Sequence, residues 1–186
     1  MVELDVRVFR YLHTTFSEGG WLALMCVLTV IGSGWGALMI LPLYLSPRTR
    51  RFAASLTTVL CVTAVVVFAL KAIVQRRRPY LVVSGVRPLV FEAPTDFSFP
   101  SGHAAGSFAF ATFVAVVLVR HAIYEPAEKK RRIALSVLTL TAALGIAMSR
   151  CALGVHFPID ILAGALLGGA FGAVGARWHL RRISAG

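Results

Sequence analysis

The sequence predicts an all-α protein: a polytopic membrane helix bundle of about five transmembrane helices, preceded by an N-terminal interfacial helix. Hydrophobic residues make up 58% of the 186 residues, and the mean hydropathy is +0.78, whereas a soluble domain is roughly 45–50% apolar. Apolar runs close to the ~20 residues that cross a hydrocarbon core recur along the chain. They leave no room for a second folded unit, so we expect a single integral membrane domain over 1–186.

The N-terminal segment, 1–20, has an amphipathic pattern. Apolar residues recur on one side at helical spacing, at Leu4, Val8, Tyr11 and Leu12. Basic and polar residues occupy the other side, as in a helix that lies on a membrane surface. The alternative is a frayed tail before Gly19 and Gly20.

The helix bundle is expected over 21–176. Its spans are predicted at 21–45, 52–74, 102–121, 133–149 and 158–176. Because this number is odd, the two termini are expected on opposite sides of the membrane. In the last span, Gly164, Gly168 and Gly172 follow one another at four-residue spacing, which predicts close packing against another helix.

The formal charge of +11 lies in short clusters between the apolar runs. A basic surface can attract nucleic acid, but this clustering is typical of span ends, and we expect no nucleic-acid partner. The clusters within 48–51, 129–132 and 177–182 share one face in the predicted topology. The positive-inside rule makes that face cytoplasmic, with 177–186 as a cytoplasmic tail.

The three cysteines have no spacing typical of a disulfide framework or a zinc site.

The opposite face carries residues that suit a phosphate dianion. Charges at membrane depth are costly, so Lys71, Arg150 and Asp160, at the edges of apolar runs, are functional candidates. Lysine supplies a point charge, and arginine supplies a planar fork that can hold two phosphate oxygens. Ser101 and the amide of Gly102 add donors at a helix start, where the helix dipole favours an anion.

Three motifs stand in order along this face: Lys71 with Arg78-Pro79, then Pro100-Ser101-Gly102-His103, then Ser149-Arg150 with His156 and Asp160. Together they resemble the three-part signature of the type 2 phosphatidic acid phosphatase family, and all three parts are complete. The resemblance covers residues 71–160. It implies a helical membrane enzyme that hydrolyses phosphomonoesters or pyrophosphates through a phosphohistidine.

The resemblance also implies a role for each residue. His156 is the nucleophile, and Asp160, one helical turn later, orients the imidazole ring and stabilises its positive charge. His103 protonates the leaving oxygen and then takes a proton from the attacking water. The phosphoryl oxygens are held by Lys71, Arg78, Ser101, Gly102 and Arg150. No cofactor is expected, and no metal, because acidic residues are few and scattered.

Other interpretations stay open. Either histidine could cap or pack at a helix end, Asp160 could cap the last span, and Lys71 could snorkel to the interface. The same site could transfer phosphate to another lipid or sugar, or the protein could bind or transport a phospholipid without turnover. A role like that of the related vanadate-binding haloperoxidases is disfavoured by the membrane character.

Two features beside the motifs are interpreted as peripheral. Arg76 and Arg77 lie outside the motif positions and are expected on a solvated basic surface that binds bulk lipid. The alternative is that they contact a second phosphate or an anionic headgroup. Residues 80–99 are expected either to rest on the membrane interface, where they shape lipid entry, or to form an ordinary ordered loop. Glu92 and Asp96 in this segment would repel a phosphate, so we expect both to face away from the site.

We expect the protein to lie in the bacterial cytoplasmic (inner) membrane with its site facing the periplasm. Its partners are a phosphorylated membrane lipid, as substrate, and the surrounding membrane lipids, while the oligomeric state is left open. The first choice of substrate is undecaprenyl pyrophosphate. Phosphatidylglycerol phosphate, phosphatidic acid and the phosphate of lipid A are the alternatives.

Overall fold

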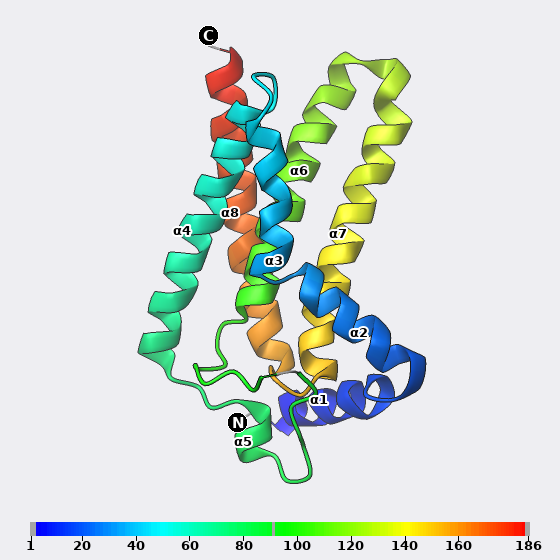
Figure 1. The fold of residues 1–186 in the computed structure, drawn as a ribbon, viewed down its shortest axis with the longest axis vertical. Coiled ribbons are helices and arrows are strands. Elements are labelled where there is room, and N and C mark those ends of the chain that lie inside the picture. Colours follow the sequence, from blue (N-terminus) through cyan, green and yellow to red (C-terminus); the bar gives the residue numbers. More distant parts are fainter. Residues whose placement is uncertain (1–2, 91, 185–186) are drawn as a thin grey trace.

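The computed structural model describes residues 3–90 and 92–184, and all of its regular elements are helices (Figure 1). In chain order these are α1 (Glu3–Phe16), α2 (Gly19–Ile31), α3 (Gly34–Ala37), η1 (Leu38–Tyr44), α4 (Arg50–Val74), α5 (Pro79–Val82), α6 (Gly102–Tyr124), η2 (Pro126–Glu128), α7 (Lys129–Ala152) and α8 (Pro158–Ser184). No strand occurs among the described residues. The predicted all-α class is confirmed.

Among the described residues, four segments are long and apolar enough to cross a membrane, and the bent pair of α1 and α2 makes a fifth if it is counted as one span. The four segments are Arg50–Val82, Gly102–Tyr124, Pro126–Ala152 and Pro158–Ser184. Only 28% to 39% of the residues in their apolar windows are buried inside the protein. Large apolar side chains therefore point outward, among them Phe68 (75% exposed) and Leu166 (67% exposed). Such a surface suits contact with lipid chains, and the chain is an integral membrane helix bundle.

The first predicted span, 21–45, is wrong as a single helix. α2 ends before a turn at Gly32 and Ser33, and the chain resumes as the short α3 and the 3-10 helix η1. At Gly32 a Cβ would lie 2.2 Å from the Ile146 side chain of α7, so the close approach requires glycine. Pro42 in η1 lacks the amide hydrogen that an α-helix needs. In Figure 1, α2, α3 and η1 together lead from the lower to the upper end of the bundle.

α1 lies across the lower end of the bundle and meets α2 at 110° (Figure 1). The apolar residues that define its predicted face are largely exposed, with Leu4 64% and Tyr11 67% exposed. Its buried residues are instead Asp5 and Phe9. α1 therefore directs a carboxylate into the protein and leaves an apolar side at the surface.

α6 and α8 form the central pair of the bundle, and the glycines of α8 bring them together. A Cβ added at Gly164, Gly168 or Gly172 would lie 2.0–2.5 Å from a backbone oxygen of α6 or of its N-cap residue, Ser101. The predicted close packing of this stripe is therefore confirmed, and α6 is the partner helix. At the lower end of the same contact, the Ser101 amide donates to the Asp160 carbonyl at 3.0 Å, so the stripe also sets the distance between two motif segments.

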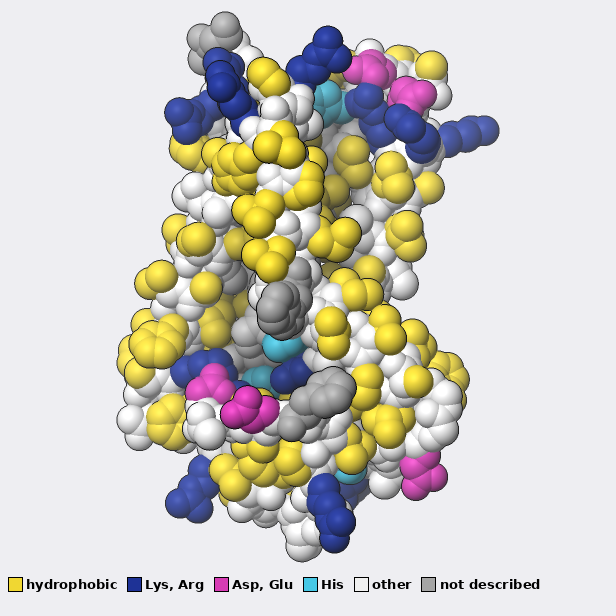
Figure 2. Space-filling model, viewed as in Figure 1, with side chains coloured by type: hydrophobic (Ala, Val, Ile, Leu, Met, Phe, Trp, Pro, Cys, Tyr) yellow, Lys and Arg dark blue, Asp and Glu magenta, His cyan; other side chains and the backbone are white. Residues whose placement is uncertain are grey.

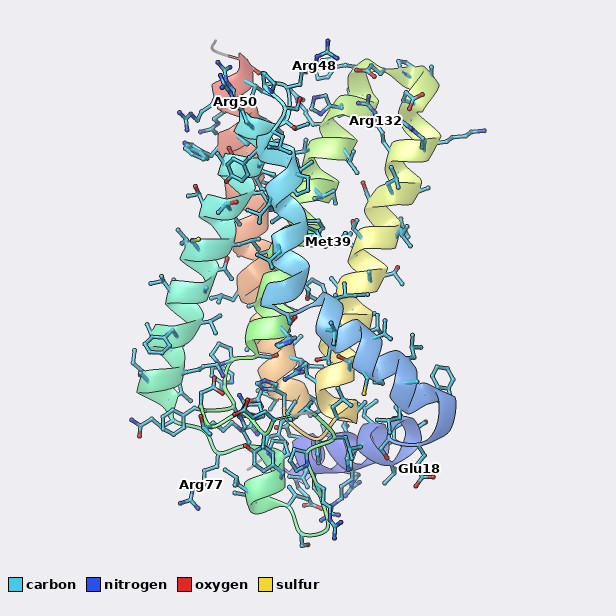
Figure 3. All side chains as sticks on the ribbon, viewed as in Figure 1. Glu18, Met39, Arg48, Arg50, Arg77 and Arg132 are labelled. Carbon is cyan, nitrogen blue, oxygen red and sulfur yellow. The ribbon has the colours of Figure 1, made fainter. Side chains whose placement is uncertain are left out.

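Basic side chains lie at both ends of the bundle (Figure 2). Arg48, Arg50 and Arg132 lie at the upper end, whereas Arg77 lies at the lower end (Figure 3). The termini also lie at opposite ends, the N-terminus low and the C-terminus high (Figure 1). α8 continues to Ser184, so the predicted tail 177–186 is helical as far as residue 184.

Candidate active site

The three motifs meet near the lower end of the bundle, although they are far apart in the sequence. Lys71 comes from the last turn of α4, His103 from the first turn of α6, and Arg150 from the last turn of α7. His156 lies in the connection that leads into α8. Figure 2 shows histidine, basic and acidic side chains gathered in a hollow of this region, with apolar side chains above it.

The His156 ring has two distinct environments. On one side, Arg78 Nη1 lies 3.2 Å from Nε2. On the other side, Nδ1 lies 3.4 Å from Ser98 Oγ and 3.7 Å from Asp160 Oδ2. This arrangement favours the tautomer with the proton on Nδ1, toward the carboxylate, and a lone pair on Nε2. Nε2 is thus the nitrogen that can attack phosphorus.

Burial keeps this imidazole neutral. His156 is 2% exposed, and the loss of solvation lowers its pKa to about 4; Asp160 opposes the shift, and the cations Arg78 and Arg150 add to it. At neutral pH the lone pair on Nε2 is therefore available without a separate base.

Asp160 is held from both sides. Its Oδ2 accepts hydrogen bonds from the Ser98 hydroxyl and, at 2.8 Å, from the Phe157 amide. Its Oδ1 pairs with Arg76 Nη1 at 2.5 Å. The bond from Phe157 shows that Asp160 also caps the first turn of α8, so the capping interpretation and the orienting role are compatible.

Asp96 contacts two of the three predicted phosphate-binding cations. Its carboxylate lies 2.9 Å from Lys71 Nζ and 2.6 Å from Arg78 Nη2. The expectation that Asp96 faces away from the site is therefore wrong. The physical reason is that two buried cations need a counter-charge, and a carboxylate can supply it through the same hydrogen bonds that a phosphate would accept.

The environment of Asp96 keeps it ionised. Partial burial disfavours its charged form, but the hydrogen bonds from Lys71 and Arg78 hold the pKa of Asp96 below its ordinary value. Its side chain is still 54% exposed, so an anion can reach the same cations from that side.

Arg150 lies on the α2 side of the site. Its Nη1 donates to the Thr29 hydroxyl of α2. Within the described part of the chain, its Nε is a buried nitrogen without a hydrogen-bond partner. A buried donor of this kind is costly when unpaired, so Arg150 has a donor left for an incoming phosphate oxygen.

The start of α6 supplies the remaining predicted donors. Ser101 is the N-cap, and its Oγ accepts from the Ala104 amide at 3.4 Å; its hydroxyl hydrogen can still donate to a ligand. Gly102 is the first helical residue, and amides of a first turn have no intrahelical acceptor. His103 follows it, within electrostatic range of Arg150, His156 and Arg78.

Arg76 does not lie on a solvated basic surface, so that interpretation is wrong. Its guanidinium connects Asp160 to Asp5, with 2.5 Å to each carboxylate, and its side chain is 19% exposed. It also stacks on the Phe157 ring at 4.3 Å. Arg77 is exposed and points away at the lower end (Figure 3).

Residues 80–90 and 92–99 connect α5 to α6 and contact residues beside the site. Leu89 donates to the Leu153 carbonyl at 3.0 Å, and the Ser98 amide donates to the Arg76 carbonyl at 2.8 Å. These two contacts attach the loop to the end of α7 and to the segment after α4. The loop thereby positions Ser98 and Asp96 in the site.

Five residues of the site were not predicted from the sequence: Asp5, Thr29, Ser98 and, as residues facing inward, Arg76 and Asp96. Thr29 and Asp5 belong to helices outside the motif region. Thr29 is a polar residue within an apolar run, which was the available signal, whereas Asp5 stands between Glu3 and Arg7 and gave none. Ser98 stands three residues before Ser101, so its closeness to a motif was the signal. Their partners could not be read from spacing.

A family model described as the PAP2 superfamily matches residues 52–184. A phosphatidylglycerophosphatase B of Bacillus subtilis is 35% identical over 99 residues, which cover 53% of this chain and 44% of the relative. A decaprenylphosphoryl-5-phosphoribose phosphatase of Mycobacterium tuberculosis is 30% identical over 141 residues, which cover 76% of this chain and 69% of the relative. The match thus spans less than half of the first relative's length.

The fold is also similar to a solved structure. The crystal structure of a transmembrane PAP2-type phosphatidylglycerolphosphate phosphatase from Bacillus subtilis aligns with a TM-score of 0.75 at 23% identity, over 98% of this chain and 89% of that chain. The likeness in fold extends beyond the family match, to α1 and α2.

Proposed function

This chain belongs to the PAP2 superfamily, and on that premise we propose that it is a membrane phosphatase that removes phosphate from a lipid phosphate or pyrophosphate through a phosphohistidine. One observation carries the proposal: the Nδ1 side of His156 faces Asp160 at 3.7 Å while Nε2 faces Arg78 at 3.2 Å. A nucleophilic nitrogen beside a phosphate-binding cation, with an acid behind the ring, is the arrangement that phosphoryl transfer to histidine needs.

In the first step, the Nε2 lone pair attacks phosphorus as the bond between phosphorus and the leaving oxygen breaks. The leaving oxygen takes its proton from His103 in the protonated form. The His156 ring then carries a positive charge, because Nδ1 keeps its proton, and Asp160 stabilises that charge. Lys71, Arg78 and Arg150, with Ser101 and the Gly102 amide, hold the equatorial oxygens.

In the second step, water attacks the phosphorus of the phosphohistidine. His103, now neutral, takes a proton from this water, the bond between Nε2 and phosphorus breaks, and inorganic phosphate leaves. His156 returns to its neutral tautomer and His103 to its protonated form. No residue needs a metal in either step.

The substrate is a phosphorylated lipid that enters from the membrane. Polyprenyl pyrophosphate is our first choice, and phosphatidylglycerol phosphate, phosphatidic acid and phosphorylated lipid A complete the set. The apolar exterior and the site near one end of the bundle support access for a lipid head group from the leaflet at that end. We place the protein in the bacterial inner membrane with this end toward the periplasm.

The test is phosphate release by the purified protein, in excess EDTA, from undecaprenyl pyrophosphate, phosphatidylglycerol phosphate, phosphatidic acid and lipid A. We expect release from one or more lipids, its loss in His156→Ala, and its retention in His121→Ala. The matched control, His121, lies at the other end of α6 and bonds to the Val117 carbonyl. Release that is unaffected by His156→Ala, or no release from any lipid, would overturn the proposal.

The orientation has a separate test. A cysteine introduced at the exposed position Ser84, in a variant without Cys26, Cys61 and Cys151, is expected to react with an impermeant thiol reagent applied from outside intact cells. A cysteine at Ser184, at the end of α8, is expected to stay protected. The opposite pattern would place the site in the cytoplasm.

A further inference from the structure

We propose that Asp5, Arg76 and Asp160 form a buried charge triad that positions the active-site carboxylate, so that the N-terminal helix α1 is part of the active site. The inference rests on the function proposed above. Asp5 and Arg76 act through Asp160 and are positioning residues, because neither contacts the His156 ring in the structure. The triad has no counterpart among the roles assigned to the motif residues.

Arg76 joins two carboxylates from opposite ends of the sequence. Nη1 lies 2.5 Å from Asp160 Oδ1, and Nη2 lies 2.5 Å from Asp5 Oδ2. The Asp160 side chain is fully buried and that of Asp5 is 1% exposed. Charges this deeply buried are strongly destabilising unless they are paired, so each member depends on the other two.

α1 holds its end of the triad firmly. Asp5 Oδ1 accepts from the Ile159 amide at 3.0 Å, which ties the helix to the first turn of α8. Phe9 packs edge-on against Phe157 at 5.4 Å, and Arg76 stacks on the same ring at 4.3 Å. α1 therefore contacts Ile159 and Phe157, which both precede Asp160 in the catalytic segment, although α1 lies outside the region that the family model matches.

The charge balance explains why two carboxylates serve one arginine. A single pair of Arg76 and Asp160 would be neutral and would leave little negative charge for the imidazole. With Asp5 added, the triad carries one net negative charge next to His156. That charge can balance the positive ring that forms when Nε2 bonds to phosphorus, in a site where charges are weakly screened.

The first measurement is steady-state hydrolysis by Asp5→Asn, Arg76→Gln and Arg76→Lys. We expect kcat to fall by about tenfold or more in Asp5→Asn and Arg76→Gln, as when a side chain that orients a reacting group is lost, while KM changes little because the phosphate-binding residues are intact. Arg76→Lys is expected to recover part of kcat. The matched controls, Glu3→Gln in α1 and Arg77→Gln beside Arg76, are exposed and should behave as wild type.

The pH profile of kcat/KM gives a readout that a purely structural role would not move. The charged and titratable groups that face His156 are Asp160, Arg78, Arg150 and His103, and the triad acts on it through Asp160. Asp5→Asn removes a negative charge, so it is expected to shift the acid limb to lower pH. Arg76→Gln removes a positive charge and is expected to shift it to higher pH.

The outcomes separate the two proposals. If wild type hydrolyses lipid phosphate but Asp5→Asn and Arg76→Gln keep full kcat, the triad proposal fails and the proposed function stands. The triad proposal would also fail if Asp5→Asn and Arg76→Gln shifted the acid limb of the kcat/KM profile equally and in the same direction. If thermal unfolding shows that a single variant is poorly folded, the test rests on Arg76→Lys and on the double variant Asp5→Asn/Arg76→Gln. The double variant should lose no more kcat than Arg76→Gln alone, because both substitutions disrupt the same triad. An inactive wild type would count against the proposed function itself.

Discussion

Asp96 and Arg78 are joined by two hydrogen bonds: Arg78 Nε donates to the Asp96 carbonyl at 2.8 Å, and Nη2 donates to its carboxylate at 2.6 Å. The second contact engages the part of the guanidinium that is expected to hold a phosphate oxygen. Because Lys71 pairs with the other carboxylate oxygen, Asp96 occupies two predicted phosphate ligands at once. A substrate that uses both cations must compete with it.

The first prediction concerns this competition. In Asp96→Asn, the loss of the carboxylate charge should lower KM, and the inhibition constant of inorganic phosphate, by about three- to tenfold, the size expected for a partly exposed charged contact. Glu92→Gln, an exposed acid in the same loop, is the control and should leave both constants unchanged. A higher KM in Asp96→Asn would show instead that Asp96 aligns Lys71 and Arg78 for binding.

The second prediction concerns Ser98. Its hydroxyl donates to Asp160 and lies 3.4 Å from His156 Nδ1, so Ser98→Ala leaves a buried carboxylate with one donor fewer. We expect kcat to fall by about tenfold with little change in KM, measured by phosphate release. Ser136→Ala, which removes a hydroxyl bonded to a backbone carbonyl in α7, should have no effect on kcat. Equal effects of the two substitutions would rule out a special role for Ser98.

The third prediction concerns the contact between α6 and α8. A Cβ at position 168 would lie 2.0 Å from the Ala105 carbonyl oxygen, whereas one at position 169 would lie 3.7 Å from its nearest neighbour, Thr112 Oγ1. Gly168→Ala should therefore destabilise the protein by about 1–3 kcal/mol and reduce activity, because the two helices carry His103 and Asp160. Gly169→Ala is the matched control. Thermal unfolding in detergent distinguishes them, and equal melting temperatures would contradict the packing argument.

The fourth prediction follows from the pKa of His156, which burial lowers to about 4 from its ordinary value of 6.5. Between these values the unfolded chain binds a proton that the folded protein does not, so the free energy of unfolding falls as pH decreases from about 6.5 toward 4. His156→Gln removes this contribution. Wild type should therefore lose more melting temperature than His156→Gln between pH 7.5 and pH 5, and identical losses would show that His156 titrates normally.

The sequence by itself determined the fold class and the residues of the motifs. Long apolar runs can cross a bilayer only as helices, since every backbone polar group must be satisfied within the segment. The glycine stripe of α8 indicated a close helix contact because a small residue every four positions lies on one face. His103, His156 and Asp160 were recognisable because the three motifs that contain them resemble a family signature; by itself, either histidine could equally have capped a helix end.

Only the tertiary structure decided how the charges pair. The predicted span 21–45 breaks at Gly32, which lies against Ile146 of α7, and the partners of Asp96 and Arg76 lie 18 to 84 residues away in the sequence. Repulsion between Asp96 and a phosphate was a correct physical premise, but it gave the wrong placement because the buried cations Lys71 and Arg78 need a counter-charge. Likewise, the amphipathic pattern of α1 does not indicate that Asp5 pairs with Arg76. Hydrophobic periodicity specifies which face of a helix is apolar, whereas ion pairing depends on three-dimensional distances that spacing along one helix does not contain.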